Sequence, residues 1–296
     1  MLLFNMIHTD HRMNDFRFRC GAIPRALCFL VMLGALVAGS SGPAAADVLR
    51  IRYSLSLIGL PFGTAGMTAT LEPNSYQIEG DAKLTGLASL ISDAKGAASA
   101  SGAILLGRVA PATYATTAAN AKLTRTVRMG MNAGTVRAVE ISPPLFDEAP
   151  DRVPVTEADK RNIIDPMSAV VMPVPSGQPL VGPAACNRTI PVFDGDSRFD
   201  LVMSYVGTRE AKAKGYAGPV SVCAVRYVPV AGYRRNRKAT QFMANNNQIE
   251  VWLAPVENAH VAVPFRMSIL TLLGTTVIEA SEFHIEPSQK AASAAP

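Results

Sequence analysis

The chain has 296 residues, with 28 basic and 23 acidic side chains and a formal charge of +5 at pH 7. Four Arg and two Asp fall in the first 46 residues, which leaves 24 − 21 = +3 on the rest. So small an excess gives no case for nucleic-acid binding, and the length fits one large β domain or two small ones.

The start of the chain has the features of an export signal. A basic segment that includes Arg17, Arg19 and Arg25 precedes an apolar run at residues 26–38, which is too short to span a bilayer with ease. Alanines at positions 44–46 supply an A-x-A cleavage pattern. We therefore predict a signal peptide over residues 1–46, cleavage between Ala46 and Asp47, and a periplasmic protein with no stable membrane span after cleavage. An uncleaved anchor is the alternative.

The first half of the exported chain indicates an antiparallel meander. Alternation is clearest at residues 49–57, and further strands are expected near 67–71 and 76–84 and in four places between 97 and 141. Between them, Thr85 is a candidate N-cap for a helix whose apolar face holds Leu87, Leu90 and Ile91. This helix would be either a lid over an apolar cavity or an ordinary cover for the sheet.

Prolines at residues 143–155 mark a candidate subdomain break. Beyond it, Asp165 is expected to cap a second short helix that begins at Pro166 and runs to Val171, because proline is tolerated in a first helical turn.

Residues 190–205 predict a hairpin around Asp194-Gly195, a pair typical of a two-residue type I′ turn. Asp194, Asp196 and Asp200 form an acidic cluster there. It is either a cation site or turn chemistry beside a solvated strand, and the ligand spacing of a calcium loop is absent.

Cys186 and Cys223 flank this hairpin and are the only cysteines after the predicted cleavage site. An even pair in an oxidising compartment predicts a disulfide, and a pair of buried free thiols is the alternative. No other cysteine or histidine stands at metal-ligand spacing.

Later strands are expected at residues 220–230, 239–244, 248–254, 261–272 and 275–285, and residues 287–296 form a predicted disordered tail. The predicted fold is therefore all-β and mainly antiparallel, with two short helices, as a single β domain over residues 47–286. A sheet this long forms a strongly curved sheet or an open half-barrel, whose concave face must be filled by helices or by a ligand.

The densest basic run comprises Arg234, Arg235, Arg237 and Lys238. It would contact an anionic group of a lipid or acidic partner, or else guard the edge of a sheet.

Catalytic chemistry has few candidates. The exported part keeps two histidines, His260 and His284, and contains no G-x-S-x-G, phosphate-loop or G-x-G-x-x-G motif. Asp165 with Ser168 suggests a hydrolase, but Asp165 is better used as a helix cap. We therefore expect no enzyme and no cofactor.

Several short motifs resemble the secreted domain-of-unknown-function 3108 family of Gram-negative bacteria. They are DPMSA at residues 165–169, IPVFDG at 190–195 with RFDL at 198–201, Cys223 with YVPVAGY at 227–233, and PFR at 264–266. The resemblance covers residues 47–285 and implies a periplasmic, mostly β protein, with no activity and no catalytic residues to transfer.

Two functions remain open on this basis. The first is a binding or carrier module for an apolar or amphiphilic cell-envelope molecule, with a lipid as its partner. The second is an envelope interaction protein with a filled core, an envelope protein as its partner and no ligand. A hydrolase ranks third.

Overall fold

The computed structural model describes residues 46–86, 88–89, 92–105, 107–144 and 149–287. In chain order its strands are β1 (Asp47–Leu57), β2 (Leu60–Leu71), β3 (Ser75–Leu84), β4 (Lys95–Leu105), β5 (Arg108–Ala119), β6 (Thr124–Asn132), β7 (Thr135–Ser142), β8 (Met172–Pro173), β9 (Arg188–Phe193), β10 (Arg198–Ala213), β11 (Tyr216–Ala231), β12 (Ile249–Val256), β13 (Val261–Thr271) and β14 (Gly274–Pro287). The helical segments are η1 (Ser168–Val170), α2 (Pro183–Cys186) and α3 (Lys238–Ala244).

All strands belong to one 14-stranded sheet built from two meanders. β1 to β7 run outward in one direction and β14 to β9 in the other, and the two meanders meet where β1 pairs antiparallel with β14. The beginning and the end of the domain therefore form its centre, and β7 and β9 are the outer strands of the main path.

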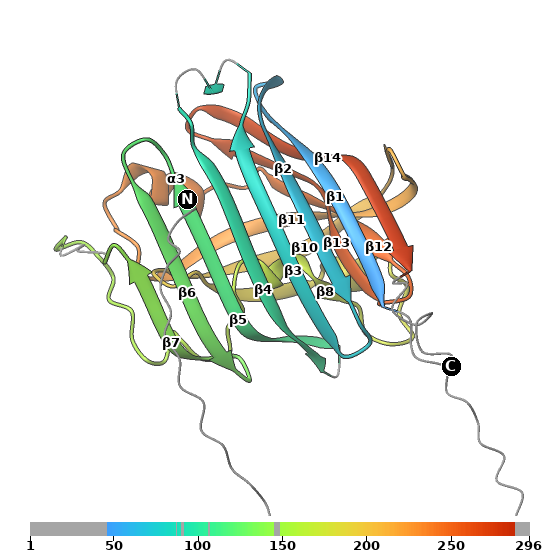
Figure 1. Cartoon of the computed structure of the whole chain (residues 1–296), viewed down its shortest axis with the longest axis horizontal. Helices are drawn as coiled ribbons and strands as arrows, with labels where there is room; N and C mark the ends of the chain where they lie inside the picture. Colours follow the sequence, from blue (N-terminus) through green and yellow to red (C-terminus); the bar gives the residue numbers. More distant parts are fainter. Residues whose placement is uncertain (1–45, 87, 90–91, 106, 145–148, 288–296) are drawn as a thin grey trace, which may run out of the picture.

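The sheet curls without closing, so the predicted open, all-β architecture is confirmed. In Figure 1, β1 to β7 form the front layer, and β10 and β11 cross behind them. Strong strand twist produces this curvature in long antiparallel sheets.

The alternation of residues explains which face is inside. In β1, Leu49 and Ile51 are buried on the concave side, while Arg50 and Arg52 are exposed on the outer side. The same period of two recurs along the meanders and sets the register, because a one-residue slip would expose the core.

The segment between the two meanders fills the gap between their outer strands. The amide of Val136 in β7 donates to Lys160, and Ile164 makes an isolated bridge to Val192 in β9. Residues 160–164 of the connecting segment therefore hold the two outer edges together.

Two local predictions are wrong. Residues 239–244, predicted as a strand, belong to α3, and the predicted helix from Pro166 to Val171 is reduced to the single 3-10 turn η1. The short helix α2 was not predicted.

Candidate functional site

The middle of the concave face is filled by side chains of the sheet itself. Leu49 of β1, Phe265 of β13 and Phe283 of β14 are almost wholly buried, and the centroids of the two phenyl rings are 6.0 Å apart. Met167 packs against this core from the connecting segment. The open apolar space lies instead at one end of the sheet.

An apolar groove of about 560 Å³ occupies the end where the β1–β2 and β13–β14 hairpins turn. Nearly all of its exposed lining is apolar. Its lining residues are Leu57, Phe62, Ala239, Phe242, Met243, Thr271, Leu272, Leu273 and Thr276. We call this space the hairpin groove.

One wall of the hairpin groove is α3. Ala239, Phe242 and Met243 stand at helical spacing i, i+3 and i+4, so they share one side of the helix. None of the residues of α3 is buried. A short helix with its apolar stripe turned toward an open groove has surface left for an apolar ligand.

A second groove of about 420 Å³ lies at the same end of the sheet. Leu55, Leu84 and Leu123 contribute to its lining. Leu55 is two residues before Leu57 on the same strand, so both point to the concave side. The helix predicted to begin at Thr85, as a lid or as a cover for the sheet, follows Leu84 in sequence, but its residues Leu87, Leu90 and Ile91 lie outside the described residues.

The basic run lies between β11 and α3, beside the hairpin groove. Arg234 is held by Asp151, with Nε 3.1 Å from Oδ1, and the amide of Asn236 donates to Oδ2 of the same carboxylate at 3.0 Å. The hydrogen bond from the Asn236 amide contributes most, and together with Arg234 it lowers the pKa of Asp151 below its ordinary value.

Arg235, Arg237 and Lys238 are exposed and make no ion pair among the residues that the structure describes. Of the four predicted contact residues, Arg234 is thus engaged in holding the loop, and three cations are left to face solvent at the start of α3.

The predicted cap residue Asp165 is buried and supports η1. Its Oδ1 accepts from the amides of Met167 and Ser168, and its Oδ2 accepts from the Ser168 hydroxyl at 2.5 Å. Ser168 Oγ also lies 2.7 Å from the Tyr76 hydroxyl. Burial raises the pKa of Asp165 despite these bonds. Ser168 is wholly buried and its hydroxyl lies within hydrogen-bond distance of both Asp165 and Tyr76, so this arrangement joins η1 to β3.

The turn at Asp194-Gly195 differs from the predicted two-residue type. Phe193 pairs with Arg198, so four residues connect β9 to β10, and Asp194 Oδ1 accepts from the amides of Asp196 and Ser197. The Asp side chain closes the loop by mimicking a backbone turn.

The neighbouring carboxylates are also engaged. Asp196 pairs with Arg152, and Asp200 pairs with Arg198 at 2.6 Å. In the described part of the chain, no three His, Cys, Asp or Glu side chains are grouped to hold a metal ion.

Cys186 of α2 and Cys223 of β11 form a disulfide, with their Cα atoms 5.4 Å apart. Both are fully buried, so the bond fixes α2 against the sheet from within.

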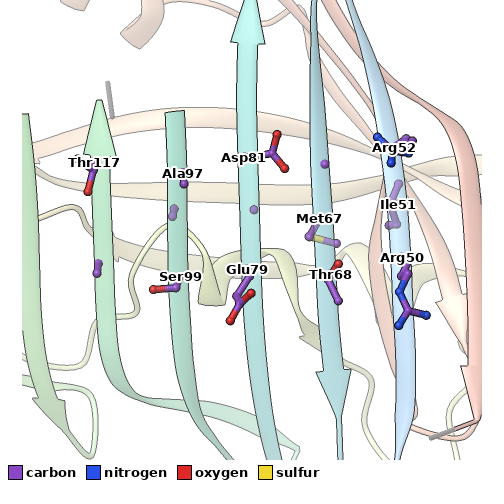
Figure 2. Close-up of a pocket in the computed structure, with 14 residues that line it drawn as sticks. Arg50, Ile51, Arg52, Met67, Thr68, Glu79, Asp81, Ala97, Ser99 and Thr117 are labelled. Atoms are coloured by element: carbon purple, nitrogen blue, oxygen red, sulfur yellow. The ribbon is translucent and has the colours of Figure 1, made fainter. Parts of the chain in front are cut away.

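A polar groove of about 620 Å³ crosses the outer face of β1 to β5. Figure 2 shows Arg50 and Arg52 on β1 at one side, Glu79 and Asp81 on β3 in the middle, and Thr117 on β5 at the far side. Arg50 is paired with Glu286. The groove is open and mixed in charge, and polar and apolar atoms share its lining, whereas the lining of the hairpin groove is almost wholly apolar.

Sequence reasoning missed the apolar residues of the site. Leu272 and Leu273 line the hairpin groove, and Ile58 and Leu60 lie on the adjoining β1–β2 hairpin. All four fall at or next to turns, where polar residues are usual. That departure from ordinary turn composition was the available signal.

None of the described helices has the length and hydrophobicity needed to cross a bilayer. The family model "Protein of unknown function (DUF3108)" matches residues 50–281. No curated protein matches the chain.

Two solved structures are similar in part. One is a beta-barrel-like protein of domain of unknown function DUF1849 from Brucella abortus, with 8% identity, a TM-score of 0.46, and coverage of 81% of this chain and 98% of that one. The other is described as a "putative lipoprotein" from Parabacteroides distasonis, with 9% identity, a TM-score of 0.27, and coverage of 82% and 96%. Both similarities are too low to carry an argument about function.

Proposed function

We propose that this chain, which belongs to the DUF3108 family of proteins of unknown function, binds an anionic amphiphile of the cell envelope without catalysis. The observation that carries the proposal is the open apolar stripe of α3, which faces the hairpin groove, together with three exposed cations at the start of the same helix that have no ion-pair partner in the described part of the chain.

The two ends of an amphiphile fit two parts of this site. An acyl chain would lie between Phe242 of α3 and Leu272 of the β13–β14 hairpin, where its transfer from water is favourable. A phosphate or carboxylate would lie near Arg235, Arg237 and Lys238, which donate charge-assisted hydrogen bonds. The groove volume of about 560 Å³ falls in the range of roughly 300–1,000 Å³ usual for small-molecule sites.

Binding of lysophosphatidylglycerol below its micelle-forming concentration tests the apolar half of the site. Phe242→Ala should weaken binding about tenfold, because it removes a large apolar contact from a helix that buries nothing in the core. Val206→Ala is the matched control, since Val206 is 61% exposed in the middle of β10 and outside the groove. Equal loss in both variants, or no binding by the parent protein, would contradict the proposal.

The charged half of the site is tested by the dependence of lipid binding on salt concentration. The double change Arg235→Ala with Arg237→Ala should weaken lysophosphatidylglycerol binding about two- to fivefold per cation at low salt and much less at high salt, since exposed charges are screened. Arg226→Ala, an exposed arginine on β11, is the control. Lysophosphatidylcholine should show little difference among these proteins.

An envelope interaction protein without a ligand is the second candidate. The packed middle of the concave face favours it, because Leu49, Phe265 and Phe283 already occupy the space that a half-barrel carrier uses for cargo. A clean apo mass in native mass spectrometry of the protein purified from its own periplasm, with no lysolipid binding, would place this function first.

A further inference from the structure

The hairpin end of the sheet exposes more apolar side chain than solubility requires. Ile58, Leu60, Leu272 and Leu273 are 68%, 72%, 59% and 75% exposed, and they are four of the five most exposed large apolar residues in the described chain. Exposed apolar patches of this kind mark interaction surfaces.

The two hairpin tips form one surface. The amide of Ile58 donates to Thr275 at 2.8 Å, and Leu57 pairs with Thr276. The Ile58 side chain lies over Gly274, where an added Cβ would stand 2.5 Å from Ile58 Cγ1. The tips of β1–β2 and β13–β14 are therefore in contact, although more than 200 residues separate them in sequence.

Ile58 is an unexpected residue for its turn. Ile58 and Gly59 have φ values of 52° and 78°, which is the pattern of a type I′ turn. Asn is favoured at the first of these positions, and a β-branched residue with positive φ is a steric outlier. An apolar side chain kept in a strained and exposed position points to selection for something other than folding.

Charge identifies the occupant of this surface. Arg235, Arg237 and Lys238 adjoin it through α3, which shares the hairpin groove with Leu272 and Leu273. Among the described residues of the β1–β2, β3–β4, β5–β6 and β13–β14 connections, Asp93 is the one carboxylate. The β9–β10 connection at the same end adds Asp194, which accepts two backbone amides, and Asp196, which is paired with Arg152. The opposite end has Glu72 and Glu257 in its connections. Apolar tips beside exposed cations match the boundary of an anionic bilayer, where side chains enter the acyl region and cations meet headgroups.

We infer that the hairpin end docks on an anionic lipid bilayer, with Ile58, Leu60, Leu272 and Leu273 inserted and Arg235, Arg237 and Lys238 on the headgroups. This deepens the proposed function, since the hairpin groove would then open toward the membrane that supplies its ligand.

Co-sedimentation with vesicles tests the inference. Protein should bind vesicles of phosphatidylglycerol mixed with phosphatidylcholine, and bind phosphatidylcholine vesicles about tenfold less. Ile58→Asn should lower binding to the anionic vesicles about fivefold without lowering the melting temperature, because Asn suits the turn better than Ile. Leu273→Ser should lower it by a similar factor.

Ala133→Asn is the matched control. Ala133 and Gly134 form the same kind of turn at the opposite end, with φ values of 48° and 71°, so Asn relieves the same backbone conformation there. It should leave vesicle binding unchanged. All variants carry the same first 46 residues, so the differences among them report the hairpin end and not the leader.

Vesicle binding that is equal in Ile58→Asn, Leu273→Ser and the parent would overturn the inference. So would self-association that Ile58→Asn abolishes in the absence of vesicle binding, because the surface would then join two copies of the chain. Lysolipid binding in solution is measured separately. Vesicle binding without lysolipid binding would contradict the proposed function alone. Lysolipid binding without vesicle binding would contradict the docking inference alone.

Discussion

At the residue scale, Asp165 shows how one buried carboxylate organises a turn. Its two oxygens accept two amides and one hydroxyl, and Ser168 extends the chain of bonds to Tyr76. Asp165→Ala would leave these donors unpaired and should lower the free energy of unfolding by about 2 kcal/mol or more. Asp165→Asn retains an acceptor for the amides and should cost less. Urea unfolding of both variants measures the difference.

The pH dependence of this effect has a definite sign. Burial raises the pKa of Asp165 above its ordinary value of 3.8, so the folded protein binds a proton more tightly than the unfolded chain does. The contribution of Asp165 to stability is therefore largest below pH 3.8 and is lost as the pH rises through the raised pKa. The stability of the parent relative to Asp165→Asn should fall over that interval. A stability difference between the parent and Asp165→Asn that does not change with pH would contradict a raised pKa for Asp165.

Both the backbone conformation and the close approach of a neighbouring strand require a glycine at position 195. Its φ is +102°, and an added Cβ would stand 2.5 Å from Val127 Cγ1 on β6. Gly195→Ala should therefore lower the free energy of unfolding by about 1–3 kcal/mol in thermal or urea unfolding. Gly59→Ala is the control, because its φ is +78° with no atom within 4 Å of the added Cβ, and it should cost less.

At the scale of elements, the disulfide attaches α2 to β11. It joins Cys186 and Cys223 across 37 residues, a span that contains the β9–β10 hairpin. Replacing both with Ser should lower the free energy of unfolding by about 2–5 kcal/mol. A reducing agent should bring the parent protein to the same value and leave the double variant unchanged. Alkylation of Cys186 and Cys223 themselves in the unreduced, denatured parent would contradict the bond.

α3 shows how an element takes its role from its neighbours. Its apolar stripe, formed by Ala239, Phe242 and Met243, covers no core, and the helix faces the hairpin groove because Leu272, Leu273 and Leu57 stand opposite. A seven-residue helix is marginal in isolation, so packing at this end of the sheet stabilises it. A ligand in the groove would add contacts to the same stripe.

At the scale of the whole molecule, the pairing of β1 with β14 places the first residue after the predicted cleavage site inside the fold. Asp47 is 1% exposed, and its Oδ1 accepts from Asn258 Nδ2 at 3.0 Å. Cleavage between Ala46 and Asp47 would put an ammonium group next to this carboxylate, where opposite charges attract. N-terminal sequencing of the exported protein should begin at Asp47. A chain that keeps residues 26–38 would show that the segment is an anchor.

The sequence by itself determined the strands, the disulfide partners and the sheet class. Period-two burial is a local property, readable in Leu49, Ile51 and Tyr53, and the two cysteines after the predicted cleavage site allow one pairing. Prediction from the sequence failed where two local patterns compete. Residues 239–244 are too few for periodicity to separate a strand from a helix, and Asp194-Gly195 fits turns of several lengths.

Only the tertiary structure decided the site. The hairpin groove combines Leu57, Phe242 and Leu272, which no local pattern connects, and it exists because β14 returns to pair with β1. Curvature then turns α3 toward the tips of the two hairpins, and the same curvature brings large side chains such as Phe265 and Phe283 together in the middle of the concave face. Whether a curled sheet is hollow or filled depends on how side chains from distant strands interdigitate. Alternation within one strand shows which side chains point inward, but not how far they are from the side chains of the opposite strands.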